Sequence, residues 1–132
     1  MSEVSRIETE PAVPFLWTRK LRLASGNPPY SSPAAGAPLV IVPCYRTEGL
    51  EAPDYPLIDL SASVENILLQ ADSLGYGAVW IGIAPNETRM TNVSEVLKLP
   101  ETLKPFCLIP VGVPAKTHEQ INRFDRSRIH EI

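Results

Sequence analysis

The sequence predicts an α+β fold, because one long amphipathic helical segment lies among short apolar segments that are typical of strands. The 132 residues, 44% hydrophobic and 20% charged, have the length and composition of one globular domain. We expect an irregular N-terminal segment at residues 1–36, followed by a core of sheet and helices at residues 37–132. The segments that carry this prediction are residues 39–44, 59–74, 78–83 and 106–114.

The first 18 or so residues contain no sustained helical or strand period. A short helical turn is expected near residues 19–24, and the glycines, serines and prolines that follow predict a loop through residues 31–38. The whole chain contains 14 prolines, which indicates long loops between short elements. No regular core element is therefore predicted before Pro38.

The first predicted strand is residues 39–44, LVIVPC, a β-branched apolar segment that we expect at the centre of the sheet. Pro43 lies near its end, where proline is tolerated. The polar, proline-containing residues 46–57 then predict a loop that leads to the long helix.

The predicted long helix presents apolar residues on one side at a spacing of three and four. Asp59 or Ser61 is expected to cap its start by accepting from free backbone amides. Gly75 is expected to end it, because glycine readily takes the left-handed conformation that reverses the chain. The apolar residues are Leu60, Val64, Ile67, Leu68, Ala71 and Leu74.

Two further strands and a second helix are predicted after the long helix. Residues 78–83 carry no charge, as a strand covered on both faces should. A short helix is expected at residues 92–97, with Asn92 as its N-cap. Residues 106–114 predict a third buried strand, and the charged tail at residues 116–132 is expected either to hang free or to pack on a partner.

Charge and cysteine content exclude several classes of function. A net charge of −3 without a Lys/Arg cluster argues against nucleic acid or an anionic membrane as partner. No apolar segment resembles a signal peptide or a membrane span, which favours a cytoplasmic location. Cys44 and Cys107 lack metal-site spacing and are expected to be buried, reduced thiols.

Four segments, in their order and spacing, resemble the C-terminal part of the nitroreductase family of FMN-dependent oxidoreductases. The resemblance extends from about Ala37 to Ile132 and is carried by four stretches: APLVIVPCY, IDLSASVENILLQADSLGYGAVWIGIAPNE, LKLPETLKPFCLIPVGVP and NRFDRSRIHEI.

The resemblance implies a three-layer α+β arrangement, with a mixed sheet flanked by helices. It also implies a homodimer that exchanges C-terminal segments and holds FMN at its interface. NAD(P)H would donate a hydride to the flavin, which would reduce a small-molecule acceptor such as a nitroaromatic or a quinone. Such chemistry belongs to the cofactor, so the absence of a P-loop, GxGxxG or nucleophile–base motif is expected.

The chain departs from the family at its start. Members usually begin with a helix and an arginine-serine-arginine type motif that grips the FMN phosphate, followed by an NxQPW-like stretch against the flavin. Residues 1–36 contain neither feature. The chain therefore resembles a truncated member, and the alternative is a non-catalytic dimerisation or interaction domain that has lost flavin binding.

By resemblance, one loop and one arginine are the candidate cofactor-binding residues. In the family the loop passes the isoalloxazine ring, where backbone amides can hydrogen-bond the N5 and O4 edge. Arg123 matches a basic position used near the FMN phosphate. On the residues alone, an ordinary strand end is the favoured interpretation of the loop, and a solvated surface arginine is an equal alternative for Arg123. Lys116 is a weaker anion-binding candidate, and Trp80 and Tyr76 are expected to pack in the core rather than on a ligand. The loop residues are Gly82, Ile83, Ala84, Pro85, Asn86 and Glu87.

Overall fold

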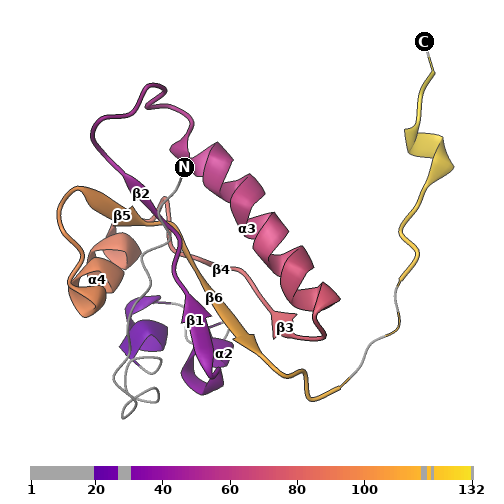
Figure 1. The fold of residues 1–132 in the computed structure, drawn as a ribbon, viewed down its shortest axis with the longest axis horizontal. Coiled ribbons are helices and arrows are strands. Elements are labelled where there is room, and N and C mark those ends of the chain that lie inside the picture. The colour runs from indigo at the N-terminus through magenta and orange to yellow at the C-terminus, as the bar shows by residue number, and fades with distance from the viewer. Residues whose placement is uncertain (1–19, 27–30, 117–118, 120, 132) are drawn as a thin grey trace.

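The computed structural model describes residues 20–26, 31–116, 119 and 121–131. A helical segment at residues 20–24 is followed by helices and strands in an α+β order (Figure 1). The elements are α2 (Ser32–Gly36), β1 (Leu39–Ile41), β2 (Cys44–Arg46), α3 (Pro56–Ser73), β3 (Gly77–Ala78), β4 (Ile81–Gly82), α4 (Glu87–Leu97), β5 (Leu103–Pro105), β6 (Cys107–Gly112) and the 3-10 turn η1 (Arg126–Arg128).

Strand β6 is the centre of the sheet. It pairs with β1, β3 and β4, and β2 pairs separately with β5; each of these ladders is antiparallel. In the register, Ile41 lies opposite Ile109 and Ile81 lies opposite Leu108. Most of β6 is buried, as the sequence predicts for residues 106–114.

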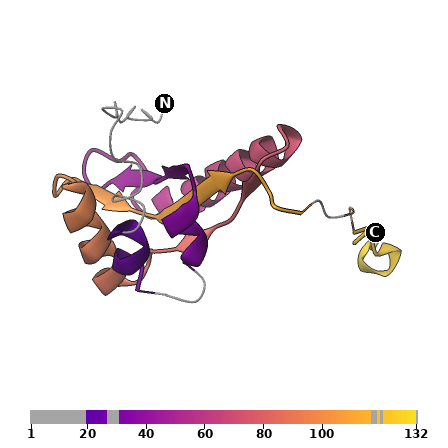
Figure 2. The same ribbon diagram turned by 90° about the horizontal axis from the view of Figure 1, so that it is seen from below.

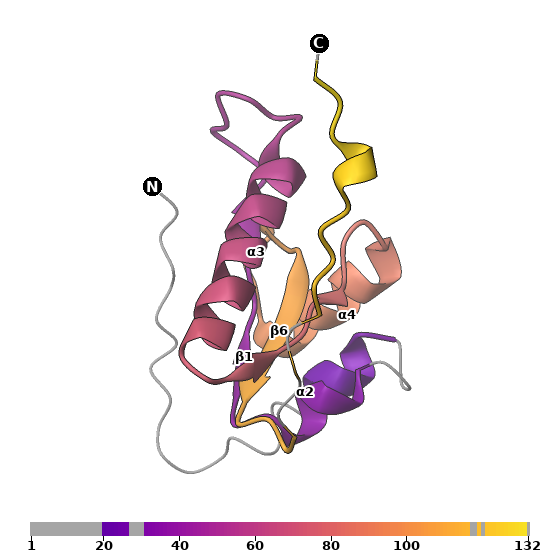
Figure 3. The same ribbon diagram turned by 90° about the vertical axis from the view of Figure 1, so that its right-hand side faces the viewer.

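The side chains of β6 alternate between two helical layers, as the pleat of a strand requires. Leu108 packs with α2, α4 and the helical residues 20–24, whereas Cys107 and Ile109 pack with α3. Figure 3 shows α3 on one side of β1 and β6, and α2 with α4 on the other. The predicted α+β fold, a sheet flanked by helices, is therefore confirmed.

The prediction of one central strand at residues 39–44 is wrong. The segment forms two short strands, β1 and β2, and β1 lies at the end of the strand order β1-β6-β3. Two residues separate Ile41 from Cys44, but three separate their partners Ile109 and Pro105, so the opposite chain carries a bulge. Pro43 lies at this break: it has no N–H to donate, and its carbonyl accepts from Phe106 at 2.9 Å.

Helix α3 begins at Pro56, one turn before the predicted caps. Tyr55 is the N-cap and makes no side-chain capping bond, so the predicted caps Asp59 and Ser61 are wrong. Pro56 starts the helix because its fixed φ suits the first helical position, and Ser61 Oγ instead donates to the Leu57 carbonyl at 2.7 Å. The end is as expected, because Gly75 follows with a φ of +79°.

The prediction of one strand buried on both faces at residues 78–83 is also wrong. The chain forms β3 and β4, with Val79 and Trp80 between them, 43% and 36% exposed. The uncharged composition of this segment therefore reflects a half-covered edge of the sheet. The buried strand of the sheet is β6, at residues 107–110.

Two helical elements differ from the sequence prediction. Residues 31–38 were predicted as loop, but α2 forms at Ser32–Gly36 and buries Ala34 beside Leu21 and Ala24. Helix α4 starts at Glu87, with Asn86 rather than Asn92 as its N-cap. Five residues are too few to show a helical period, and both asparagines precede a helix-compatible segment.

After β6 the chain leaves the body of the fold. The described residues 121–131 are all exposed, and Figures 1 and 2 show this yellow segment extending away from the sheet. Its ion pairs are local, from Arg126 to Glu131 at 2.7 Å and from Arg128 to Asp125 at 3.2 Å. Among the described residues, no helix has the length and apolarity needed to span a bilayer.

Candidate functional site

The predicted loop forms one tight connection from the end of β4 to the start of α4. Ile83 is fully buried beside Leu108 and anchors the loop to the core, while Ala84 is half-buried. The Ala84–Pro85 peptide bond is cis. The other four predicted residues, Gly82, Pro85, Asn86 and Glu87, are exposed.

Most backbone donors of this loop are used within the chain. The amides of Ile83 and Ala84 both donate to the Phe106 carbonyl, at 3.3 and 2.9 Å. The Asn86 amide donates to the Ile83 carbonyl at 3.1 Å, and Pro85 has no N–H. These residues shape the loop, but they do not offer their amides to a ligand.

The open backbone donors lie at the first turn of α4. An α-helix leaves its first N–H groups without an intrahelical acceptor, and here these include the amides of the exposed residues Glu87 and Thr88. The Asn86 side chain uses another of them by accepting from the Arg89 amide at 3.0 Å. Thr88 is not among the residues predicted from the sequence, because the helix was expected to start at Asn92. An N-cap at Asn86 would have placed Thr88 in the first turn of the helix.

The surface beside these amides is open at Gly82. A Cβ atom built on Gly82 meets no other atom within 4 Å, so a flat ligand can approach the backbone there. The first turn of α4 also carries the positive end of the helix dipole, which favours an electron-rich group. Open amides and open backbone together suit a planar ligand that carries hydrogen-bond acceptors on one edge.

Tyr45 of β2 is an ionisable side chain near the loop residue Glu87. Tyr45 packs against both core clusters, and burial together with the nearby Glu87 carboxylate raises the pKa of its phenol. Lys104 lies directly opposite Tyr45 in the β2–β5 ladder. The phenol therefore stays protonated at neutral pH and can act as a hydrogen-bond donor.

The candidate cations of the tail lie apart from this loop in a single chain. Arg123 belongs to the exposed segment that leaves the fold after β6, on the side away from α4 (Figures 1 and 2). Lys116 is exposed as well. The structure thus brings together the six predicted loop residues but does not bring Arg123 to them within one chain.

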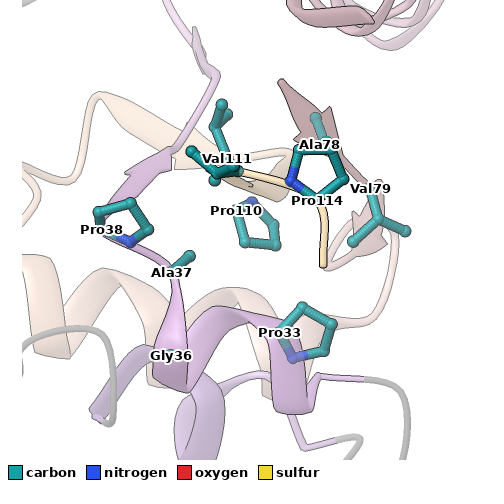
Figure 4. A pocket seen from close by; sticks show the side chains of 12 residues that line it. Pro33, Gly36, Ala37, Pro38, Ala78, Val79, Pro110, Val111 and Pro114 are labelled. Carbon is teal, nitrogen blue, oxygen red and sulfur yellow. The ribbon is translucent and has the colours of Figure 1, made fainter. Parts of the chain in front are cut away.

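An apolar groove lies at the other end of β6 (Figure 4). It has a volume of about 390 Å3 and runs between α2 and the ends of β1, β3 and β6. A Cβ atom on Gly112 would lie 3.3 Å from Cδ of Pro38, so a larger residue at this position would require the Pro38 ring to shift. The lining residues are Pro33, Gly36, Ala37, Pro38, Gly77, Ala78, Val79, Pro110, Val111, Gly112, Val113 and Pro114.

The remaining chemistry-bearing groups do not form a second centre. Across the part of the chain that the structure describes, no group of three metal-ligating side chains is present. Cys44 and Cys107 are free thiols, one half-buried and the other buried. Trp80 packs edge-on against Phe106 with ring centroids 5.3 Å apart, but it is 36% exposed. Tyr76 is 46% exposed, so the prediction that these two aromatic residues pack in the core is wrong.

Comparison with known proteins identifies the family to which this fold belongs. Residues 7–113 match the nitroreductase family, beginning before the expected start near Ala37 and ending before the tail. The chain belongs to the nitroreductase family.

Individual relatives agree with this assignment. A Methanothermobacter thermautotrophicus protein provisionally named NADH dehydrogenase/NAD(P)H nitroreductase is 38% identical over 102 residues, covering 77% of this chain and 53% of its own length. Bacillus subtilis FMN reductase (NADPH) is 31% identical over 74 residues, covering 56% of this chain and 29% of that protein. The crystal structure of a provisionally named NADH oxidase from Clostridium acetobutylicum has a TM-score of 0.75 at 38% identity, covering 86% of this chain and 69% of that one. The chain spans about half the length of the curated relatives it matches.

The loop fits one part of the cofactor that the family implies. The ring system of FMN is planar and carries acceptors along one edge, which matches the open surface at Gly82 and the first-turn amides of α4. The phosphate needs a cation, and Arg123 of the same chain lies away from the loop. The loop of one chain therefore fits the ring of such a cofactor, whereas Arg123 does not lie beside that loop in the same chain.

Proposed function

We propose that the protein is an FMN-dependent oxidoreductase that transfers hydride from NAD(P)H to nitroaromatic, quinone or similar small-molecule acceptors. The observation that carries this proposal is the pair of open amides at the start of α4 beside the bare backbone of Gly82. Bound FMN supplies the redox chemistry, by accepting a hydride from the nicotinamide and passing electrons to the acceptor.

The chain's own residues have positioning roles in this proposal. The Glu87 and Thr88 amides donate to the acceptor edge of the ring, and Gly82 permits its close approach. Ile83 fastens the loop to the core, so these donors keep their directions without a ligand. Preorganised donors favour a ring that gains negative charge on reduction.

The proposal includes a homodimer in which each tail reaches the other subunit. The exposed residues 121–131 lie away from the loop of their own chain, but an exchanged tail would bring Arg123 to the loop of a second copy. Its planar guanidinium suits a phosphate because it offers paired donors. A cytoplasmic location belongs to the same proposal, because NAD(P)H is supplied there.

The visible absorption spectrum of the purified protein tests this function. We expect a flavin band that bleaches anaerobically with NADH or NADPH and returns when a quinone or nitroaromatic is added. A second sample, stripped of flavin and titrated with FMN, gives the dissociation constant. A folded, colourless protein that does not bind added FMN would contradict the proposal.

A specific observation supports the alternative, a non-catalytic dimerisation domain. The amides of Ile83 and Ala84 are already bonded to Phe106, so the loop has fewer ligand donors than its sequence suggests. This alternative predicts dimers of unchanged stability with and without FMN. Flavin-dependent stabilisation of the folded protein would exclude it, since a ligand that binds only the folded state raises the free energy of unfolding.

A further inference from the structure

Arg89 connects three segments around the candidate loop. Its backbone N–H donates to Asn86 Oδ1 at 3.0 Å, and its Nη1 donates to the Gly82 carbonyl at 3.2 Å. A Cβ atom on Gly26, which has a φ of +62°, would lie 3.6 Å from Arg89 Cγ. One residue of α4 therefore binds both ends of the loop and packs on the turn after residues 20–24.

The bond to Gly82 fixes a whole peptide plane. The Gly82 carbonyl and the Ile83 N–H belong to the same trans peptide and point in opposite directions. The carbonyl is bonded to Arg89 on one side, and the N–H is bonded to the Phe106 carbonyl at 3.3 Å on the other. The plane cannot rotate without losing both hydrogen bonds.

This restraint acts where the chain is otherwise free to move. Gly82 has no side chain, its surroundings are open, and β4 ends there after two residues. The Arg89 guanidinium is a charged donor, and charge-assisted hydrogen bonds are stronger than neutral ones. Arg89 forms no ion pair with a carboxylate of the described residues, so no such group draws it away from the carbonyl.

We propose that Arg89 is a positioning residue for the ligand-binding loop. By holding the Gly82 carbonyl and the Asn86 cap together, it keeps the Glu87 and Thr88 amides directed toward the open surface at Gly82. The ligand class is a planar heterocycle with acceptors on one edge, which under the proposed function is the flavin ring. The inference rests on that function for its ligand, but the restraint itself exists without any ligand.

Hydrogen exchange tests whether Arg89 restrains the loop, and flavin binding tests whether that restraint serves the ligand. In flavin-free protein, Arg89→Met should raise amide exchange in Gly82–Thr88 by about tenfold, the loss expected for one hydrogen bond. Arg89→Lys, which retains a charged donor, should restore most of the protection. Arg46→Met, at an exposed arginine of β2, is the matched control and should leave this region unchanged.

In the flavin-bound protein, Arg89→Met should weaken FMN binding by about tenfold and alter the visible spectrum of the bound flavin. Arg89→Lys should lie near the wild type in both measurements, a rescue that a purely structural packing role would not produce. If Arg89→Met does not fold, Arg89→Gln, which keeps a neutral donor, takes its place.

Two results would overturn the inference. The first is loop exchange and FMN affinity within about twofold of the wild type in Arg89→Met, a difference below that of one hydrogen bond. The second is a uniform rise of exchange across α4 and β6, which would make Arg89 a general stabiliser. If the wild-type protein binds no FMN, the proposed function fails, while the exchange comparison still decides whether Arg89 restrains the loop.

Discussion

The carbonyl oxygen of Phe106 accepts from the backbone N–H of Ala84 at 2.9 Å and so ties the candidate loop to the residue that precedes β6. The same carbonyl accepts from Ile83, and the Phe106 amide donates to Pro43. Phe106 thus links the loop to Pro43, which lies at the break between β1 and β2. The geometry of the loop therefore depends on how Phe106 itself is held.

Shortening Phe106 should destabilise the protein and loosen the loop. Its side chain is 6% exposed and packs against Trp80, so Phe106→Ala should cost about 3 to 5 kcal/mol in free energy of unfolding. Urea unfolding followed by circular dichroism measures this loss. Trp80→Phe is the control, because it keeps an aromatic partner at a partly exposed position, and we expect a smaller change. Equal losses in the two variants would show that the loop anchor is not specific to Phe106.

Removing the Asn86 cap of α4 should lower the free energy of unfolding more than replacing Asn92, which lies within the helix. The Asn86 side chain accepts from the Arg89 amide at 3.0 Å, so Asn86→Ala should reduce the free energy of unfolding by about 1 kcal/mol. Asn86→Asp should be close to the wild type, since aspartate is also a good cap. Asn92→Ala, within the helix, should change stability by no more than about 0.5 kcal/mol. A larger loss at Asn92 than at Asn86 would contradict the observed helix start.

The elements that the sequence predicts well are those with a long, one-sided apolar pattern. The residues from Leu60 to Leu74 show a helical period over four turns, and residues 106–114 form a continuous apolar segment, so α3 and β6 are correctly located. The strand prediction is wrong where the apolar pattern is short. LVIVPC reads as one strand because the bulge opposite Pro43 depends on the register with β6, which no local pattern records.

The candidate site, like the fold, is predicted only in part from the sequence. The resemblance located the loop, but it could not tell that the Phe106 carbonyl uses the amides of Ile83 and Ala84. Nor does any motif mark Arg89, because its partner Gly82 lies seven residues earlier and is bonded through its backbone. Backbone acceptors leave no signature in the sequence, so these roles become visible only in three dimensions.

The thiols of Cys44 and Cys107 should be unreactive at neutral pH, and their ionisation should lower the free energy of unfolding at alkaline pH. Burial raises the pKa of Cys44 from 9.0 to about 11, and burial with the nearby Cys44 raises that of Cys107 to about 12. Between pH 9 and 11 the unfolded chain loses thiol protons that the folded chain retains, so the free energy of unfolding decreases as pH rises. Below pH 9 the stabilising contribution is fully present.

Alkylation kinetics measure this protection. At pH 8 iodoacetamide should label both cysteines much faster in urea than in the folded protein, and Cys107 more slowly than Cys44 in the folded state, because Cys107 is buried. The peptides identified by mass spectrometry separate the two sites. Rapid labelling of folded Cys107 would contradict its position in the core.

Removing the tail should dissociate the proposed homodimer. Ile121 and Phe124 are 73% and 69% exposed in the single chain, and apolar side chains at such exposure gain free energy when a second copy covers them. A chain that ends at Ala115 should be monomeric by analytical ultracentrifugation, whereas the full chain should be dimeric. The double variant Ile121→Ser and Phe124→Ser keeps the tail length and should also weaken the dimer. Under the proposed function both changes should reduce FMN affinity, because Arg123 would no longer reach the second subunit. A full chain that sediments as a monomer would exclude the exchanged tail and would assign the phosphate side of the site to residues of the same chain.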